Sequence, residues 1–455
     1  MKLFSIQETL IKSLLIITIS FISQFSFSQS NVTIYDLETF VNTVRENNLQ
    51  LKISKNKSSV ADLSIKEAIS ALLPQINGQT QVKRNLNDQY TFFEAPDFGN
   101  IDPVTGDVPQ VIQRFKTNFD NEFQANILLE QNLFSLKSIY DLKSARQFSN
   151  IGKLQNEDQI IKIIAEAKKA FLQTVLIKNV YEVSQVSELL AKENYLAAKN
   201  KFENQLISEL DLLQAKIRWE EELPKLLKAK RNYLILLGNL KVIAGINPTD
   251  SIVIDYDLAA YELKEGTVNS NDVIGNRIDY QLLEANNYMQ ELNIKNKQAE
   301  YYPTLNLRAG YSYFSSADNR SINDNLNKIV YTAVTFTVPI FSGGFRKSQI
   351  SKAKILSNIA LLEKQEAKLS MTVEIQNLEL KLSEEYKTIQ VAKSKGETAK
   401  KAYKIAVETA KIGLISQLDL RIISNDYNRA EINLYSSIYN FKCTQIDFNN
   451  AIANY

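Results

Sequence analysis

The chain has no histidine among its 455 residues and only one cysteine, Cys443. Without histidine it lacks the side chain that most often serves proteins as a general base and as a metal ligand. A single cysteine forms neither a disulfide framework nor a cysteine-based zinc site. These absences argue against an enzyme and against a metal centre, and the composition predicts no cofactor.

Glycine and proline are also scarce, with 13 and 8 residues that gather at a few places. Between Lys153 and Leu223 there is neither, which indicates an unusually long helix. The 53 basic and 51 acidic residues leave a net charge of +2. Nucleic-acid-binding proteins rely on a clear excess of positive charge, so we expect no nucleic-acid partner.

The N-terminus has the features of a secretory signal. Lys2 and Lys12 supply positive charge, the apolar run Ser13–Phe27 follows, and small residues precede Gln29. Residues 1–28 are therefore expected to be a signal peptide. The alternative is an N-terminal membrane anchor, for which this run is short compared with the span of about 20 residues that a membrane helix needs.

One seven-residue phrase occurs twice. Leu206–Leu212 recurs as Leu414–Leu420, 208 positions later, and six of the seven positions match in chemical type. The phrases around Pro74 and Phe134 also recur, in the same order, around Pro303 and Phe341. Three ordered pairs predict a duplicated chain. We assign its parts as a first repeat, 29–245, a linker, 246–271, and a second repeat, 272–455.

Each repeat predicts a helix, two strands, a very long helix and a shorter helix, because the hydrophobic period changes from 3.6 to 2 and back. A long helix of about 68 residues would extend roughly 100 Å. The proline- and glycine-containing stretch 85–116 is expected to be a loop. The predicted strands are about 75–84, 118–131, 304–314 and 328–339, and the long helices are about 136–203 and 345–411.

The predicted strands have about ten residues or slightly more, which is close to the roughly 9–11 residues that cross an outer membrane, and their side chains alternate between apolar and polar. Four strands do not close a membrane barrel, and an open edge would leave backbone groups unpaired in lipid. Three copies would supply 12 strands. An ordinary soluble sheet is the alternative.

These phrases resemble the TolC-type outer-membrane efflux protein family over nearly all of the mature chain. The resemblance implies a mainly helical protomer with membrane strands, and a homotrimer in which a 12-strand outer-membrane β-barrel continues into a periplasmic α-helical barrel. It also implies the outer membrane of a Gram-negative bacterium, a periplasmic adaptor and an inner-membrane transporter as partners, and contact with outer-membrane lipid. The residues that carry it are Leu72-Leu73-Pro74, Tyr301-Tyr302-Pro303, Val338-Pro339-Ile340-Phe341-Ser342-Gly343-Gly344 and Gly413-Leu414-Ile415-Ser416.

The resemblance places the repeated phrases at the periplasmic mouth. It implies that Asp211 and Asp419 constrict the pore, and that the adaptor docks on Gln205, Leu206, Ile207, Ser208, Gly413, Leu414, Ile415 and Ser416. The corners between strands and helices would be Pro74, Pro303, Pro339, Gly343 and Gly344.

The sequence also departs from the family at its tips. Ile422 replaces a second acid, Ala410 and Ile415 replace the latch residues, and Gln205 replaces a glycine, so the two turns could differ in geometry. A purely structural reading is that Ser208 and Ser416 cap the following helices.

The favoured function is therefore a passive duct that serves a tripartite efflux or type I secretion system. Two other readings stay open at this point. A periplasmic coiled-coil adaptor would have one helical hairpin rather than two, and a structural stalk would have sustained heptads without paired strands. Nothing in the sequence names an exported substrate.

Overall fold

The computed structural model describes residues 33–258, 273–318 and 326–455. The predicted signal peptide, 1–28, lies outside the described residues, as does the 259–271 part of the predicted linker. The chain forms two compact units. The first combines residues up to Ile53 with Gln159–Ile274 and Thr372–Tyr455, and the second combines Ser54–Asp158 with Gly275–Met371.

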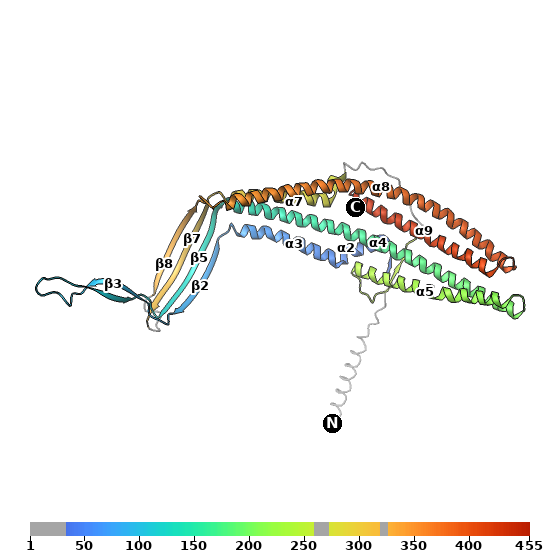
Figure 1. The fold of residues 1–455 in the computed structure, drawn as a ribbon, viewed down its shortest axis with the longest axis horizontal. Coiled ribbons are helices and arrows are strands. Elements are labelled where there is room, and N and C mark those ends of the chain that lie inside the picture. Colours follow the sequence, from blue (N-terminus) through green and yellow to red (C-terminus); the bar gives the residue numbers. More distant parts are fainter. Residues whose placement is uncertain (1–32, 259–272, 319–325) are drawn as a thin grey trace, which may run out of the picture. The chain divides into compact units, whose positions relative to one another are not determined.

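The second unit contains one antiparallel sheet of four long strands. Their order is β2-β5-β7-β8, so the strand pair of the first repeat lies beside the pair of the second (Figure 1). Among the described strands, β2 and β8 have a neighbour on one side only. The bounds are β2 Gln75–Arg84, β5 Asn121–Ser135, β7 Thr304–Ala317 and β8 Asn327–Thr337.

The register of this sheet separates its two faces chemically. Ile76 lies opposite Leu129, Leu129 opposite Ala309, and Tyr311 opposite Val330, so apolar residues form continuous rows on one face. This apolar face is open, since Ile76 is 68% and Val330 71% exposed. The other face holds polar side chains, including the pairs Lys83–Glu122 at 3.4 Å and Arg308–Glu130.

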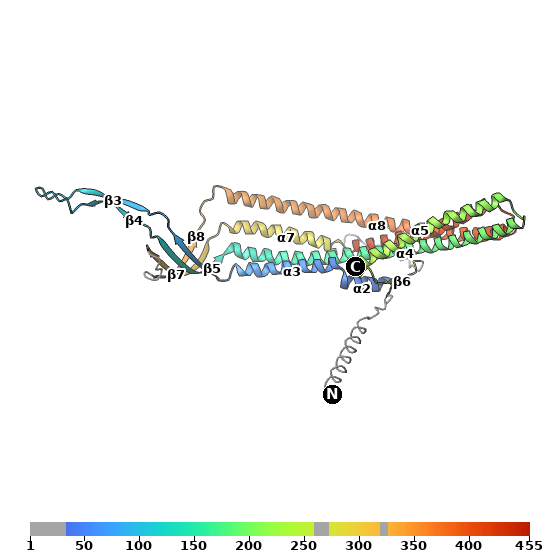
Figure 2. The same ribbon diagram turned by 90° about the horizontal axis from the view of Figure 1, so that it is seen from below.

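The stretch predicted as a loop contains a second hairpin. Strands β3 (Tyr90–Pro96) and β4 (Gln110–Lys116) pair in antiparallel register (Figure 2). The loop prediction was wrong for this part because it was based on the prolines and glycines of the stretch. These residues lie at the end of β3 and in the connection between the strands, where they do not interrupt the hydrogen-bonded pairs. Gly106 has a φ of 74°, which suits the turn that joins the strands.

Lys116 ties the base of this hairpin to the large sheet. Its ammonium group lies 2.8 Å from Asp88, 2.9 Å from Asp120 and 3.1 Å from Asp318. The hydrogen bonds that Lys116 donates to these carboxylates raise its pKa, and they lower the pKa of Asp88 and of Asp318. The lysine therefore stays charged and links segments about 200 residues apart.

Helical segments follow the sheet in the same order as its strands, α3, α4, α7 and α8. Figure 2 shows these helices side by side in that order. Side-chain contacts join each pair of neighbours. Ser149 on α4 hydrogen-bonds Asp62 on α3, the Gln147 amide donates to the Ala285 carbonyl at 2.8 Å, and Lys364 on α8 lies 3.0 Å from Glu284 on α7. The bounds are α3 Leu49–Ser70, α4 Leu136–Glu203, α7 Ile278–Ala299 (preceded by the 3-10 turn Ile274–Asn276) and α8 Phe345–Lys411.

The first predicted helix is two helices, because the chain breaks at Asn48 between α2 (Leu37–Asn47) and α3. The Asn48 side chain accepts a hydrogen bond from the Leu51 N–H at 3.0 Å and donates to the Ile243 carbonyl at 2.7 Å. These bonds replace those that the break removes. One of them reaches 195 residues along the chain, so local sequence could not reveal it.

The core of the first unit gathers around Phe171. Its ring is fully buried, 5.3 Å from the Phe40 ring and 5.8 Å from the Tyr256 ring. Two short strands that the sequence did not predict, β1 (Thr33–Tyr35) and β6 (Ile252–Ile254), pair in parallel beside this core. Apolar burial of this kind supplies most of the stability of a folded unit.

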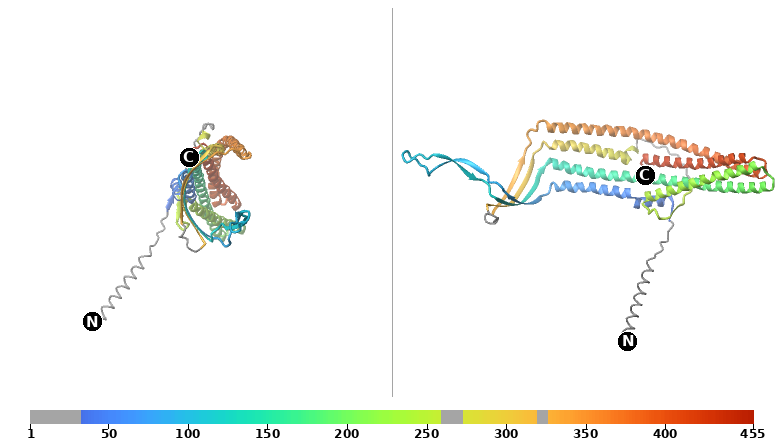
Figure 3. Two further views of the ribbon diagram at one scale, coloured as in Figure 1. Left: turned by 90° about the vertical axis from the view of Figure 1, so that its left-hand side faces the viewer. Right: turned by 60° about the horizontal axis from the view of Figure 1, so that its bottom comes forward.

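Two helical hairpins complete the first unit. The first hairpin joins α4 to α5 (Glu209–Ala244), and the second joins α8 to α9 (Gln417–Ala451) (Figure 3). Helix, strand pair, very long helix and shorter helix therefore occur twice, which confirms the predicted duplicated architecture. Among the described residues, no helix is both long enough and apolar enough to cross a membrane.

Candidate functional site: the paired helical tips

The two tips, residues 203–211 and 411–419, have the same local structure. Ser208 and Ser416 have extended backbones, and each hydroxyl accepts a hydrogen bond from the N–H three residues on, at 3.2 and 3.1 Å. These are N-caps, which satisfy an otherwise unpaired donor at the start of a helix. The capping role predicted from sequence is therefore present at both tips.

The turns themselves are also alike. Gln205 has a φ of 58° and Gly413 a φ of 78°, and both turns bond the next residue back across the helix end, Leu206 to Lys201 and Leu414 to Thr409. The geometric difference expected from the replacement of glycine by Gln205 is not seen. Gln205 instead adopts the left-handed conformation, at a cost of roughly 1–2 kcal/mol.

The two candidate pore aspartates have equivalent partners. Asp211 accepts a hydrogen bond from the Ser208 hydroxyl at 2.6 Å, and Asp419 accepts one from Ser416 at 2.7 Å. A carboxylate in the first turn also interacts favourably with the helix dipole. Both charges are thus fixed at helix N-termini, and Asp419 is exposed.

A cavity of about 1140 Å³ lies between the tips, and it gathers most of the predicted docking residues. Leu206, Ile207, Ser208 and Asp211 line it from the first hairpin, and Gly413, Leu414, Ile415 and Ser416 from the second. Its other charged residues are mainly basic: Arg218, Lys201, Lys400, Lys404 and Lys411, against Glu193 and Glu408.

Arg218 is the residue at this site that sequence reasoning missed. It is only 7% exposed, and its guanidinium donates to the Ser424 hydroxyl at 2.5 Å, which joins α5 to α9. Burial lowers the pKa of Arg218, while nearby Tyr403 and Glu222 act in the opposite sense. Aligning the two repeats would have exposed it, because the residue 208 positions later is Asp426, of opposite charge.

Each hairpin is also fastened by one stacked aromatic pair. The Tyr195 and Trp219 rings lie 5.4 Å apart at 12°, and the Tyr403 and Tyr427 rings 5.3 Å apart at 9°. The Trp219 indole N–H donates to Glu188 at 2.8 Å, so this side chain anchors packed helices, as predicted from sequence. The pairs are separated by the same 208 positions as the tips.

The predicted corners lie in the second unit. Pro74 and Pro303 immediately precede β2 and β7, and Pro339 follows β8. Gly343 and Gly344 have φ values of 59° and 85° just before α8, a conformation that glycine adopts without steric penalty. Across the described residues, no cluster of three or more side chains is suited to hold a metal ion.

Residues 270–447 match the model of the outer membrane efflux protein family. No curated protein sequence matches the chain. The fold is similar to the CmeC outer membrane channel of Campylobacter jejuni, at 19% identity and a TM-score of 0.72 over 92% of this chain and 85% of that one. It is also similar to the open MtrE outer membrane channel of Neisseria gonorrhoeae, at 15% identity and a TM-score of 0.71 over 91% and 88%. The family match therefore lies in the second repeat, and the fold of these outer membrane channels extends over about nine tenths of the chain.

Proposed function

We propose that this protein is the outer-membrane channel of a tripartite efflux or type I secretion system. It would act as a passive duct that receives substrates from a periplasmic adaptor and an inner-membrane pump. The observation that carries the proposal is the exposed apolar face of the β2-β5-β7-β8 sheet, opposite a polar face with ion pairs. This is the arrangement of a strand set with lipid on one side and water on the other.

The open edges of the sheet determine how many copies the channel needs. Edges β2 and β8 would leave unpaired backbone groups in lipid, so we propose that β8 of one copy pairs with β2 of the next. Three copies give a closed 12-strand barrel. The helical hairpins of each copy would extend the channel into the periplasm, where the tip cavity would receive the adaptor.

The experiment uses charges placed on the two faces of the sheet. Val330→Lys lies on the apolar face, where a lysine within the bilayer costs up to about 2–4 kcal/mol depending on depth. Gln79→Lys lies on the polar face. We expect the natural chain and Gln79→Lys in the outer-membrane fraction as conducting trimers, with Val330→Lys depleted. A soluble monomeric natural chain, or equal depletion of the two variants, contradicts the proposal.

We further propose that Asp419 favours cations at the periplasmic mouth, since three exposed carboxylates would meet there. Asp419→Asn keeps the shape of the side chain and removes its charge, so the cation-to-anion permeability ratio of single channels in planar bilayers should fall. Asp107→Asn, in the β3–β4 connection, removes a distant carboxylate and should leave the ratio unchanged. An unaltered permeability ratio in Asp419→Asn would contradict the proposed role of Asp419.

A further inference from the structure

The two hairpins correspond residue by residue at an offset of 208 positions. The caps at Ser208 and Ser416 obey this offset, and so do the stacked pairs Tyr195–Trp219 and Tyr403–Tyr427. Any surface that one hairpin uses therefore has an equivalent surface on the other.

Within the chain, the hairpins meet through different faces. We call the face that the first hairpin uses face A and the face that the second hairpin uses face B; their residues are given below. The clearest bonds are Arg218 to Ser424 and the Asn194 amide to Gln417 at 2.7 Å. Face A consists of Val186, Leu190, Asn194 and Arg218, and face B of Lys400, Tyr403, Ser424 and Tyr427.

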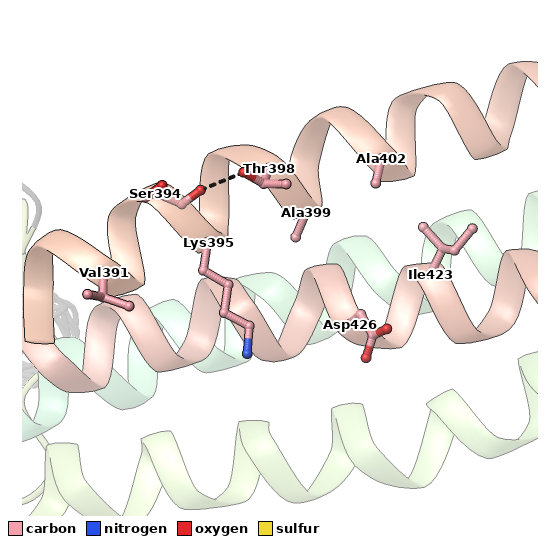
Figure 4. Close-up of a pocket in the computed structure, with 8 residues that line it drawn as sticks. All are labelled: Val391, Ser394, Lys395, Thr398, Ala399, Ala402, Ile423 and Asp426. Carbon is pink, nitrogen blue, oxygen red and sulfur yellow. Dashed lines mark hydrogen bonds between the residues drawn. The ribbon is translucent and has the colours of Figure 1, made fainter.

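Within the described residues, this arrangement leaves one copy of each face outside the junction between the two hairpins. Face A of the second hairpin is Ser394, Thr398, Ala402 and Asp426, and it surrounds a hollow of about 520 Å³. Figure 4 shows this hollow, with Lys395 reaching from α8 toward α9, which carries Ile423 and Asp426. Face B of the first hairpin is Lys192, Tyr195, Lys216 and Trp219.

Residues at the junction between the hairpins are buried, whereas their equivalents on the two open faces are exposed. Arg218 and Ser424 are buried at 7% and 4% exposure. Their equivalents, Asp426 and Lys216, are exposed, and the Lys216 side chain is 48% accessible.

The hollow beside face A of the second hairpin is also lined by Val391 and Ile423, and face B of the first hairpin carries the stacked rings of Tyr195 and Trp219. Covering this apolar surface would add stability.

We propose that face A of the second hairpin is covered by face B of the first hairpin of a second copy, so that Asp426 pairs with Lys216 of the partner subunit. The bond within the chain, Arg218 to Ser424, places these two positions together. The equivalent pair between copies carries opposite charges, which is the complementarity that a specific interface requires. The occupant is therefore a second copy of this chain.

The proposal rests on the proposed trimeric channel and defines how its helical part assembles. When two different faces meet, each copy is related to the next by a rotation, and a closed ring forms if these rotations add up to a full turn. Each copy would supply one internal junction, Arg218–Ser424, and share one external junction, Asp426–Lys216 of the partner subunit. The first and second hairpins would then alternate around the ring.

Thiol cross-linking in outer membranes tests the pairing. In a Cys443→Ala background, Lys216→Cys combined with Asp426→Cys should yield covalent dimers and trimers with a short bis-maleimide on denaturing gels. The matched pair, Arg218→Cys with Ser424→Cys, should yield only chains of monomer size, since its thiols lie in one copy. Each single cysteine variant should also stay monomeric.

The outcomes separate this inference from the function on which it rests. If the double variant gives no cross-linked oligomer while native gels still show trimers, the interface is wrong and the channel stands. If native gels show only monomers, the proposed trimer itself fails.

Charge reversal gives an independent readout. Asp426→Lys and Lys216→Asp should each lower the temperature at which trimers dissociate, because like charges would then face each other. The combined reversal should restore that temperature, whereas additive losses would contradict the pair.

Discussion

Truncation of Phe171 to alanine is expected to cost about 3–5 kcal/mol of folding free energy, the usual range for a large aromatic side chain in a core. Phe171 is fully buried, and its ring contacts those of Phe40 and Tyr256. Its removal leaves a cavity among elements that come from the two ends and the middle of the chain, which have no other way to fill the space.

Circular dichroism during heating of the purified protein in detergent measures this loss as a lower melting temperature. Phe148→Ala is the matched control, because Phe148 lies on the same helix α4 and is 48% exposed. Surface substitutions of this kind usually change stability by about 0.5 kcal/mol or less. Similar melting temperatures for the two variants would show that the Phe171 cluster does not hold the first unit together.

Gly245→Ala should be nearly as damaging, although it adds a single methyl group. Gly245 has a φ of 66° at the end of α5, and an added Cβ would lie 2.5 Å from the carbonyl oxygen of Asn47. The left-handed conformation costs roughly 1–2 kcal/mol, and the forced displacement of a backbone group adds about 1–3 kcal/mol. The close approach of α5 to α2, which the Asn48 side chain also secures, would be lost.

Gly413→Ala separates the two contributions. Gly413 has a φ of 78°, but an added Cβ there would meet nothing within 4 Å. Only the cost of the left-handed backbone conformation applies at this position. The melting temperature of Gly413→Ala should therefore fall less than that of Gly245→Ala. Equal losses would mean that the Asn47 contact is easily relieved.

Much of this fold follows from local patterns in the sequence. Alternation along β2 and β8 predicts strands, because a paired strand places successive side chains on opposite faces. The scarcity of glycine and proline predicts the long helices, and the repeated Ser and Asp at the tips predict their caps. These signals are strong because a few neighbouring residues determine them.

Most of the features that sequence reasoning missed depend on distant partners. The break at Asn48 is stabilised through Ile243, and β1 pairs with a strand more than 200 residues away. Strand β3 has a partner within its own stretch, but the prolines and glycines around it obscured its short alternation. Arg218 was overlooked because a charged residue on a long helix is normally solvated, and only the neighbouring hairpin buries it.

The tip aspartates show the limit of carrying a site over from sequence alone. Asp211 and Asp419 occupy equivalent places and accept equivalent hydrogen bonds. Asp211 lines the cavity between the hairpins, and Asp419 is not among its lining residues. Local chemistry therefore predicts the cap in both cases, but it does not predict that only one of the two carboxylates lines this cavity.

Trp219 gives the protein its own optical probe, because it is the only tryptophan in the chain. Its indole is stacked on Tyr195 and hydrogen-bonded to Glu188, so its emission reports on one location of known surroundings. Selective excitation of tryptophan therefore gives an emission signal from the first hairpin alone, without an added label and without a contribution from the sheet.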